Sequence, residues 1–185
     1  RHLYNFFVAD EAQVPAWSVT PPRDPEAVDL LAGALMDTGY DFRSVLRLLF
    51  NSDFFKTARF AKVKSPAEAV VGTLRFVGGA ERPQPDTMDW SNQITYMGQE
   101  LLNPPSVEGW HTGKEWVNSG SIVARVNFTA DRLSNTDLPG VQSMIERVAS
   151  NGAALTAETL VDRCLDLMGP LEVAESTRKE LVAHA

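Results

Sequence analysis

Apolar side chains recur every three to four residues along most of this chain, which is the spacing of an amphipathic α-helix. Asp24 followed by Pro25 marks a helix start, and Gly39 marks its end. Asp41 caps the next predicted helix, whose apolar positions continue to Leu49. Because one residue separates the stop from the next cap, we expect a tight helix pair with a sharp bend.

The same periodicity continues towards the end of the chain. Ser65 and Glu68 have the spacing of a capping box. The helical faces predicted from here on are Val70, Val71, Leu74 and Val77; Trp90, Ile94, Met97 and Leu101; Ile122, Val123, Val126, Ala130 and Leu133; Val141, Met144, Ile145 and Val148; and Leu160, Val161, Cys164, Leu165 and Met168. A weakly apolar helix is expected over about 172–183, and no strand-like alternation is present. The predicted fold is therefore all-α, an irregular domain of about eight to nine helices.

Residues 103–116 interrupt the helical pattern with prolines, glycines and tryptophans, and we call this stretch the Trp loop. Its two consecutive prolines end the preceding helix, and its glycines permit backbone angles barred to other residues. Trp110 and Trp116 carry large rings, and we expect at least one of them to be buried. The Trp loop is thus predicted to be a corner between two helices.

A second irregular stretch, residues 10–24, is rich in proline and is predicted to be held against the core by Trp17. Residues 1–134 are expected to form the main helical domain, and residues 135–185 a C-terminal helical extension packed on it. The apolar pattern is already under way at the first residues, without a helix cap. We therefore expect the chain to be the C-terminal piece of a longer protein.

Composition narrows the classes of function. The net charge of −7 argues against a nucleic-acid partner, because a phosphate backbone would be repelled. The nearest basic cluster, Arg59, Lys62 and Lys64, is short, and no apolar run is long enough to span a membrane. The single cysteine, Cys164, lies on the apolar side of a predicted helix and is expected to be a small buried hydrophobic residue.

Two catalytic arrangements within the Trp loop are weak. His111 and Glu115 have the spacing of two metal ligands on a helix, but no third ligand is near, so neither a metal nor a cofactor is predicted. Ser106, Glu108 and His111 are the residue types of a nucleophilic triad, but working triads gather their groups from separate elements. Ser106 and Glu108 are instead predicted to satisfy backbone donors in a turn. Catalytic residues are not identified.

A ligand site is the stronger possibility. Exposed tryptophans in the loop would stack on a sugar ring or hold a partner's side chain, whereas buried ones would lock the loop onto its neighbouring helices. Arg125 and Asn127 would either clamp an anion or satisfy carbonyl groups of the Trp loop, and we favour the second role. The candidate ligand-binding residues are Glu108, Trp110, His111, Trp116 and Arg125.

Several motifs together resemble a bacterial family catalogued as domain of unknown function 1800. They are residues 3–8, 62–68 and 98–105, the pair Gly109-Trp110, and Trp116 with residues 124–128. The resemblance covers nearly the whole chain and implies the C-terminal part of an often exported, longer protein. Members tend to be encoded beside a second uncharacterised family that resembles sulfatases. His111 departs from the family, where proline or another small residue is usual.

Two functions follow as hypotheses. The first is a non-catalytic helical scaffold or partner-binding module of an exported protein, periplasmic or extracellular, whose partner is another envelope protein. The alternative is part of a hydrolase or carbohydrate-binding protein that acts on envelope polysaccharide or sulfated glycan. Exposure of the two loop tryptophans would favour the alternative, and a sealed loop would favour the first.

Overall fold

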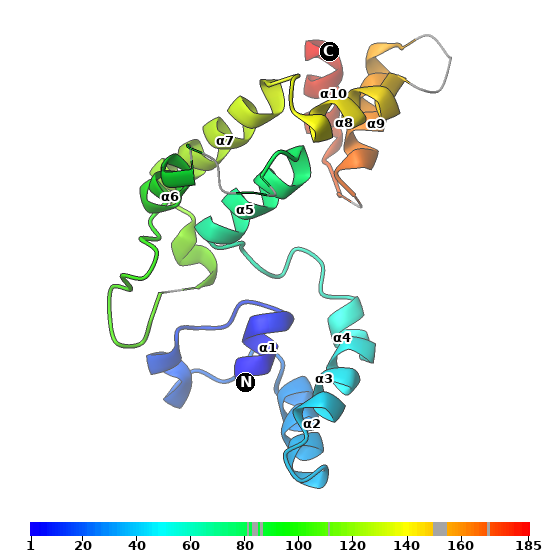
Figure 1. The fold of residues 1–185 in the computed structure, drawn as a ribbon. Helices are drawn as coiled ribbons and strands as arrows, with labels where there is room; N and C mark the ends of the chain where they lie inside the picture. The colour runs from blue at the N-terminus through cyan, green and yellow to red at the C-terminus, as the bar shows by residue number, and fades with distance from the viewer. Residues whose placement is uncertain (81, 83–84, 86, 111, 150–154, 170) are drawn as a thin grey trace. The chain divides into compact units, whose positions relative to one another are not determined.

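A computed structural model describes residues 1–185 except 81, 83–84, 86, 111, 150–154 and 170 (Figure 1). The described residues form ten α-helices and two short 3-10 helices and contain no strand, which confirms the all-α prediction. In chain order these are α1 His2–Phe7, η1 Val14–Ser18, α2 Pro25–Asp37, α3 Phe42–Asn51, α4 Asp53–Lys56, α5 Pro66–Val77, α6 Thr87–Tyr96, η2 Gly113–Trp116, α7 Ser119–Ser134, α8 Pro139–Ala149, α9 Ala157–Leu167 and α10 Glu175–His184.

The chain divides into two compact units that interleave along the sequence. Unit 1 comprises Arg1–Val71 and Pro85–Phe128, and unit 2 comprises Gly72–Gln84 and Thr129–Ala185. The Trp loop lies entirely in unit 1. The division expected from the sequence, at residue 134, remains a prediction.

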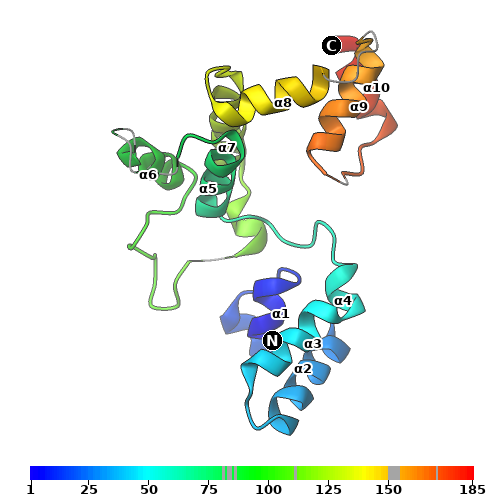
Figure 2. The ribbon, with the colours of Figure 1, turned by 45° about the vertical axis from the view of Figure 1, so that its right-hand side comes forward.

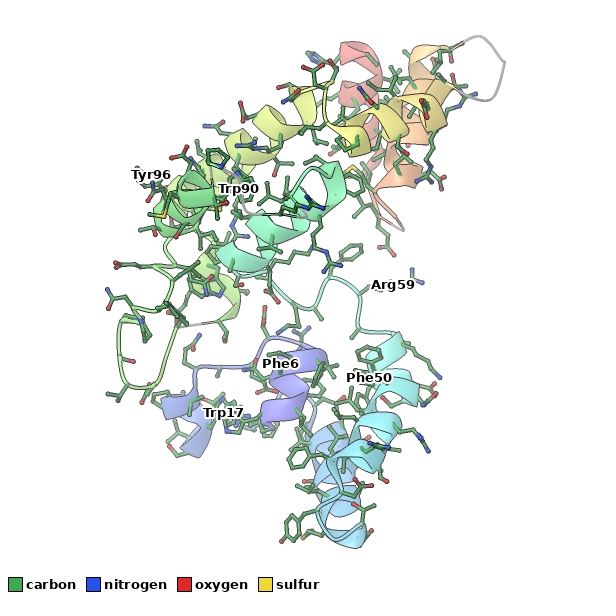
Figure 3. The ribbon with its side chains drawn as sticks, viewed as in Figure 1. Phe6, Trp17, Phe50, Arg59, Trp90 and Tyr96 are labelled. Atoms are coloured by element: carbon green, nitrogen blue, oxygen red, sulfur yellow. The ribbon has the colours of Figure 1, made fainter. Side chains whose placement is uncertain are left out.

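The core of unit 1 is built where α1 meets α2 and α3. Its buried residues are Tyr4, Val8, Ala9, Ala27, Leu31, Val45 and Leu49. A row of aromatic rings extends it: Phe7 lies edge-on to Phe50, with ring centroids 5.2 Å apart, and Phe50 lies 5.2 Å from Phe55 (Figure 3). Rings in this geometry add to the stability that their buried area provides. The ring of Phe50 therefore joins α3 both to α1, which is distant in the sequence, and to α4, which follows it directly.

The predicted pair of helices is confirmed, and α2 and α3 run side by side in both ribbon views (Figures 1 and 2). The Asp24 carboxylate accepts a hydrogen bond from the Ala27 N–H at 3.0 Å. Asp41 begins α3 in the same way, accepting from the Arg43 N–H at 3.1 Å. Each side chain satisfies a backbone donor that the first turn of a helix leaves free, so both starts are fixed locally.

The proline-rich stretch 10–24 is ordered by a buried ion pair. The Glu11 carboxylate accepts from Arg1 Nε at 3.0 Å and from Arg1 Nη2 at 2.7 Å. The guanidinium also lies 4.7 Å from the ring centre of Trp17, whose Nε1–H donates to the Ala12 carbonyl at 2.6 Å (Figure 3). The prediction that Trp17 holds this stretch is confirmed, although an arginine and a glutamate do much of the holding.

Unit 2 contains one close approach of two backbones. A Cβ atom built on Gly140 would lie 2.3 Å from the Phe76 carbonyl oxygen, so only glycine fits at the start of α8. Helices α8, α9 and α10 follow, with α9 packed against both of the others. Thr156, whose place before an apolar helical pattern predicts a cap, caps α9 and also forms a capping box with Thr159. Cys164 is exposed, so the prediction that it is buried is wrong: α9 buries Val161 and turns the cysteine outward.

Several predicted helix faces differ from the structure: Val71, Ile145 and Met168 are exposed, and the faces of α6 and α7 also differ. Helix α6 ends at Tyr96, and Gly98 follows with φ at 101°, so Leu101 lies beyond the helix and is exposed. On α7, the predicted apolar face points outward. Ile122, Val123 and Val126 are 45%, 58% and 60% exposed, whereas Phe128 is buried. Apolar periodicity located this helix but gave the wrong inner face.

Candidate functional site

The Trp loop is attached to the N-terminal part of unit 1. The side-chain amide of Gln13 donates to the Thr112 carbonyl at 3.0 Å. Gly113, with φ at 66°, lies so close to Asp10 that a Cβ atom there would be 3.1 Å from the Asp10 Cβ. Asp10 is held in turn by the Val63 N–H, which donates to its carboxylate at 2.6 Å. Three segments distant in the sequence therefore meet at the end of the loop.

The last residue of the loop, Trp116, is joined to the first turn of α7. Trp116 is buried, which confirms that at least one loop tryptophan is covered. The Ser121 hydroxyl donates to the Trp116 carbonyl at 2.8 Å, and the Ser121 N–H donates to Asn118 Oδ1 at 2.9 Å. Because Ser121 is itself buried, this serine fixes the loop end against the helix.

Arg125 lies on this inner face of α7. Residues 121, 125 and 128 share a helix face by their spacing, and Ser121 and Phe128 are both buried. Side chains on a helix lean towards its N-terminus, so the arginine extends back towards the turn that carries Ser121. Its Nε and Nη2 atoms are buried and have no hydrogen-bond partner among the described residues.

The charge of Arg125 is therefore uncompensated in this part of the chain. Burial lowers the pKa of its guanidinium below the ordinary value, and no charged neighbour contributes to that shift. The expectation that Arg125 satisfies carbonyls of the Trp loop is wrong for Nε and Nη2. Gln13 and Ser121 do that work instead. Asn127, the other expected support, is exposed.

Trp110 is the second group in the loop with an unused donor. The residue is half-buried, and its indole Nε1 atom is buried with no hydrogen-bond partner in the described structure. Trp90 of α6 has the same feature (Figure 3). A buried indole N–H usually finds an acceptor, so each marks a place where an acceptor would be favourable.

Two acidic residues of the loop, Glu108 and Glu115, are exposed. Glu108 is exposed, and its N–H donates to the Ser106 hydroxyl at 3.2 Å. The predicted turn role of Ser106 is thus confirmed. Glu115 is also exposed, beside Lys114 in η2. His111, which both catalytic arrangements required, lies outside the described residues.

The described residues contain neither a group placed to hold a metal ion nor a helix able to cross a membrane. No group of three or more His, Cys, Asp or Glu side chains there is placed to hold a metal ion. None of the described helices is long and apolar enough to cross a membrane.

Sequence reasoning found Trp116 and Arg125 but missed the residues that position them. Asn118 and Ser121 have the three-residue spacing of a helix cap, which was a signal available in the sequence. Gln13 and Asp10 gave no such signal, because their partners are about a hundred residues away. Trp116 is hydrogen-bonded to Ser121 of α7, and Glu108 lies on an exposed part of the loop.

A family model described as "Protein of unknown function (DUF1800)" matches residues 1–185. The searches of curated proteins and of solved structures found no match.

Proposed function

We propose that this chain, which belongs to the DUF1800 family, is a non-catalytic helical module that binds a protein partner through the outward face of α7. The observation that carries the proposal is that the apolar side of α7 faces outward. Ile122, Val123 and Val126 are exposed, while the opposite side, with Ser121 and Phe128, is buried.

An outward-facing apolar side of a helix lowers stability unless another molecule covers it. Each of these side chains is about half exposed, so it forgoes roughly half of the 1.5 to 3 kcal/mol that full burial provides. Ile122 and Val126 are four residues apart and form a ridge, with Val123 beside it, which is the arrangement that a helix offers to an apolar groove. This supports a partner with a complementary apolar groove or helix.

The proposed location is outside the cytoplasm, in the periplasm or beyond the cell, with another envelope protein as the partner. The resemblance of the sequence to often exported proteins supports this location. Fractionation of cells that make the natural protein would test it, and recovery solely from the cytoplasm would contradict it.

Site-specific photocrosslinking tests the binding face directly. A photoreactive amino acid at position 126 is expected to give a discrete adduct with one protein in producing cells, and the adduct should disappear when Ile122 is changed to Glu. The same group at position 47, on the exposed side of α3, is the matched control. Equal adducts from both positions, or none from position 126, would contradict the proposal.

A second candidate function is binding of an envelope polysaccharide or sulfated glycan. The unused donors of Trp110 and Arg125 favour it, because sugars and their sulfate or carboxylate groups supply acceptors. A panel of neutral, uronic and sulfated polysaccharides, with binding and product release both measured, separates this function from partner binding. No binding across the panel would exclude it.

A further inference from the structure

We propose that Arg125 is the centre of a binding site for a monovalent oxyanion, a carboxylate or a sulfate ester, held side-on by the Nε–Nη2 edge of its guanidinium. The site is separate from the outward apolar face of α7, so it does not depend on the partner proposed above. Its four supporting observations concern the shape of the free edge, its burial, its position and its charge.

The two unpartnered atoms are the pair that binds an oxyanion from the side. Nε–H and one N–H of Nη2 point in the same direction from the planar guanidinium, which matches the oxygens of a carboxylate. Unit 1 contains an occupied example of this edge. Arg1 uses Nε and Nη2 to hold the Glu11 carboxylate at 3.0 and 2.7 Å. Arg125 presents the same edge with no acceptor among the described residues.

Burial makes the lack of a hydrogen-bond partner at Arg125 Nε and Nη2 unfavourable. Both nitrogen atoms are shielded from water, and a guanidinium remains charged at any physiological pH. A buried charge is usually paired, because the lost hydration is otherwise uncompensated. An anion that enters from solution would restore the missing interactions, and water around it would be replaced by two charge-assisted hydrogen bonds.

The position of Arg125 explains why the chain itself does not fill the site. The neighbouring turn of α7 is occupied by Ser121, whose hydroxyl is already committed to the Trp116 carbonyl. The carbonyls nearest in the sequence are used within the helix. The nearest carboxylate along α7, Asp131, is exposed and pairs with Arg132 at 3.8 Å. None of the described residues accepts from this edge, and the proposal assigns that place to a ligand.

Charge selects the class of ligand. One guanidinium neutralises one negative charge, so a dianion such as hydrogen phosphate would leave a buried net charge. The net charge of −7 on the whole chain adds to the repulsion of a dianion. Carboxylates and sulfate esters are both monoanions with two acceptor oxygens on one side. They occur on acidic sugars, sulfated sugars and peptides, and the proposal concerns the chemistry that these share.

Calorimetric titration of the whole chain at constant ionic strength tests the site, with chloride as the background anion. The probes are acetate, methyl sulfate and inorganic phosphate. Acetate, methyl sulfate or both are expected to bind the natural chain more tightly than phosphate does. Arg125→Gln should weaken that binding at least tenfold, the loss expected when charge-assisted hydrogen bonds are removed.

Arg125→Lys keeps the charge but loses the planar edge, so a weakening of at least several-fold is also expected from it. Arg47→Gln, which removes an exposed arginine from α3, should leave binding unchanged. If Arg125→Gln fails to fold by circular dichroism, the lysine variant decides.

The proposal is overturned if neither monoanion binds the natural chain, or if phosphate binds more tightly than both. It is also overturned if Arg47→Gln weakens binding as much as the Arg125 variants do. If acetate binds and methyl sulfate does not, the ligand is a carboxylate on an acidic sugar or a peptide. The reverse result identifies a sulfate ester.

Discussion

Arg1 and Arg125 belong to the same unit and carry the same group, yet their surroundings are opposite. The Arg1 side chain is 11% exposed and pairs with Glu11, whose side chain is 1% exposed. The carbonyls of Thr20 and Pro21 accept two more of its hydrogen bonds, at 2.8 and 3.1 Å. The edge of Arg125 is buried with nothing to accept from it in the described chain.

The comparison separates an arginine that stabilises the fold from one whose edge is unpaired among the described residues. Arg1 orders the proline-rich stretch 10–24 because its guanidinium donates hydrogen bonds to Glu11 and to the carbonyls of Trp17, Thr20 and Pro21. Burial desolvates the Nε–Nη2 edge of Arg125, and that edge donates no hydrogen bond to the described residues. A residue with a structural cost and no structural return is a candidate for binding, and the following substitutions test whether the two arginines differ in this way.

Glu11→Gln should have the largest effect, because it turns Arg1 into a second buried cation without a counter-charge. Breaking a buried pair by removing one partner costs about 3 to 5 kcal/mol of unfolding free energy. Urea unfolding followed by tryptophan fluorescence measures the loss. Glu26→Gln, an exposed acid in the first turn of α2, is the control and should cost less than about 1 kcal/mol. Equal losses would mean that burial of the pair is unimportant.

Gly113→Ala should loosen the point at which the N-terminal region and the Trp loop meet. An alanine at a φ of 66° is strained, and its Cβ would press on Asp10 at 3.1 Å. We expect a loss of about 1 to 3 kcal/mol, measured by thermal or urea unfolding. Gly120→Ala lies nearby in α7, where a Cβ has ordinary clearance. That control should be neutral or slightly stabilising.

Arg125→Met should change stability little, by about 1 kcal/mol or less, and towards greater stability if the loop accommodates the methionine. Removing an unpaired buried charge removes its unfavourable desolvation energy. Arg1→Met, in contrast, would leave the buried Glu11 carboxylate without its counter-charge and would lower the free energy of unfolding. Parallel urea titrations of the two methionine variants compare the arginines directly. A loss above about 2 kcal/mol for Arg125→Met would show that Arg125 has a structural partner, and the contrast would fail.

Substitution of Asp41 should have the smallest effect on stability, because its carboxylate has hydrogen-bond partners but is exposed to solvent. The Ser44 hydroxyl, followed by the backbone of Arg43, holds the pKa of this carboxyl below its ordinary value of 3.8. The folded-state pKa is thus lower than the unfolded one. The resulting stabilisation is present above the ordinary value and is lost as pH falls through the lowered pKa.

The Asp41→Asn variant tests this sign. Its melting temperature should lie slightly below that of the natural chain near pH 6, and the gap should shrink as pH falls towards 2. Thermal melts at several pH values measure the gap. A gap that widens in acid would reverse the assignment. The experiment shows how much weaker a local, solvated partnership is than the buried pair at Arg1.

Local features of the fold were predictable because they depend on residues close together in the sequence. The caps at Asp24, Asp41 and Thr156 involve backbone donors within one helical turn, and each was found. The inner face of α7 was not predictable in this way. Periodicity assumes that the apolar side faces the core, and Ile122 and Val126 break that assumption.

The site was predictable only as a set of residue types. The Trp loop, the burial of at least one of its tryptophans and the choice of Arg125 as a candidate followed from the sequence. Whether Arg125 supports the loop or binds a ligand depended on which donors the loop already had, and these come from Gln13 and Ser121. A contact such as Gln13 to Thr112 leaves no local pattern, so only the folded arrangement assigns Arg125 its free edge.

The interleaving of the two units has a consequence for anyone who wishes to handle them separately. Their boundaries fall after Val71, after Gln84 and after Phe128, so no truncation from either end yields one complete unit free of residues from the other. A fragment that stops at Phe128 carries residues 72–84 away from their partners, and one that starts at Thr129 lacks them. A protease that cuts once leaves pieces that each hold an incomplete unit. Separate expression of unit 1 requires residues 71 and 85 to be rejoined by a designed linker.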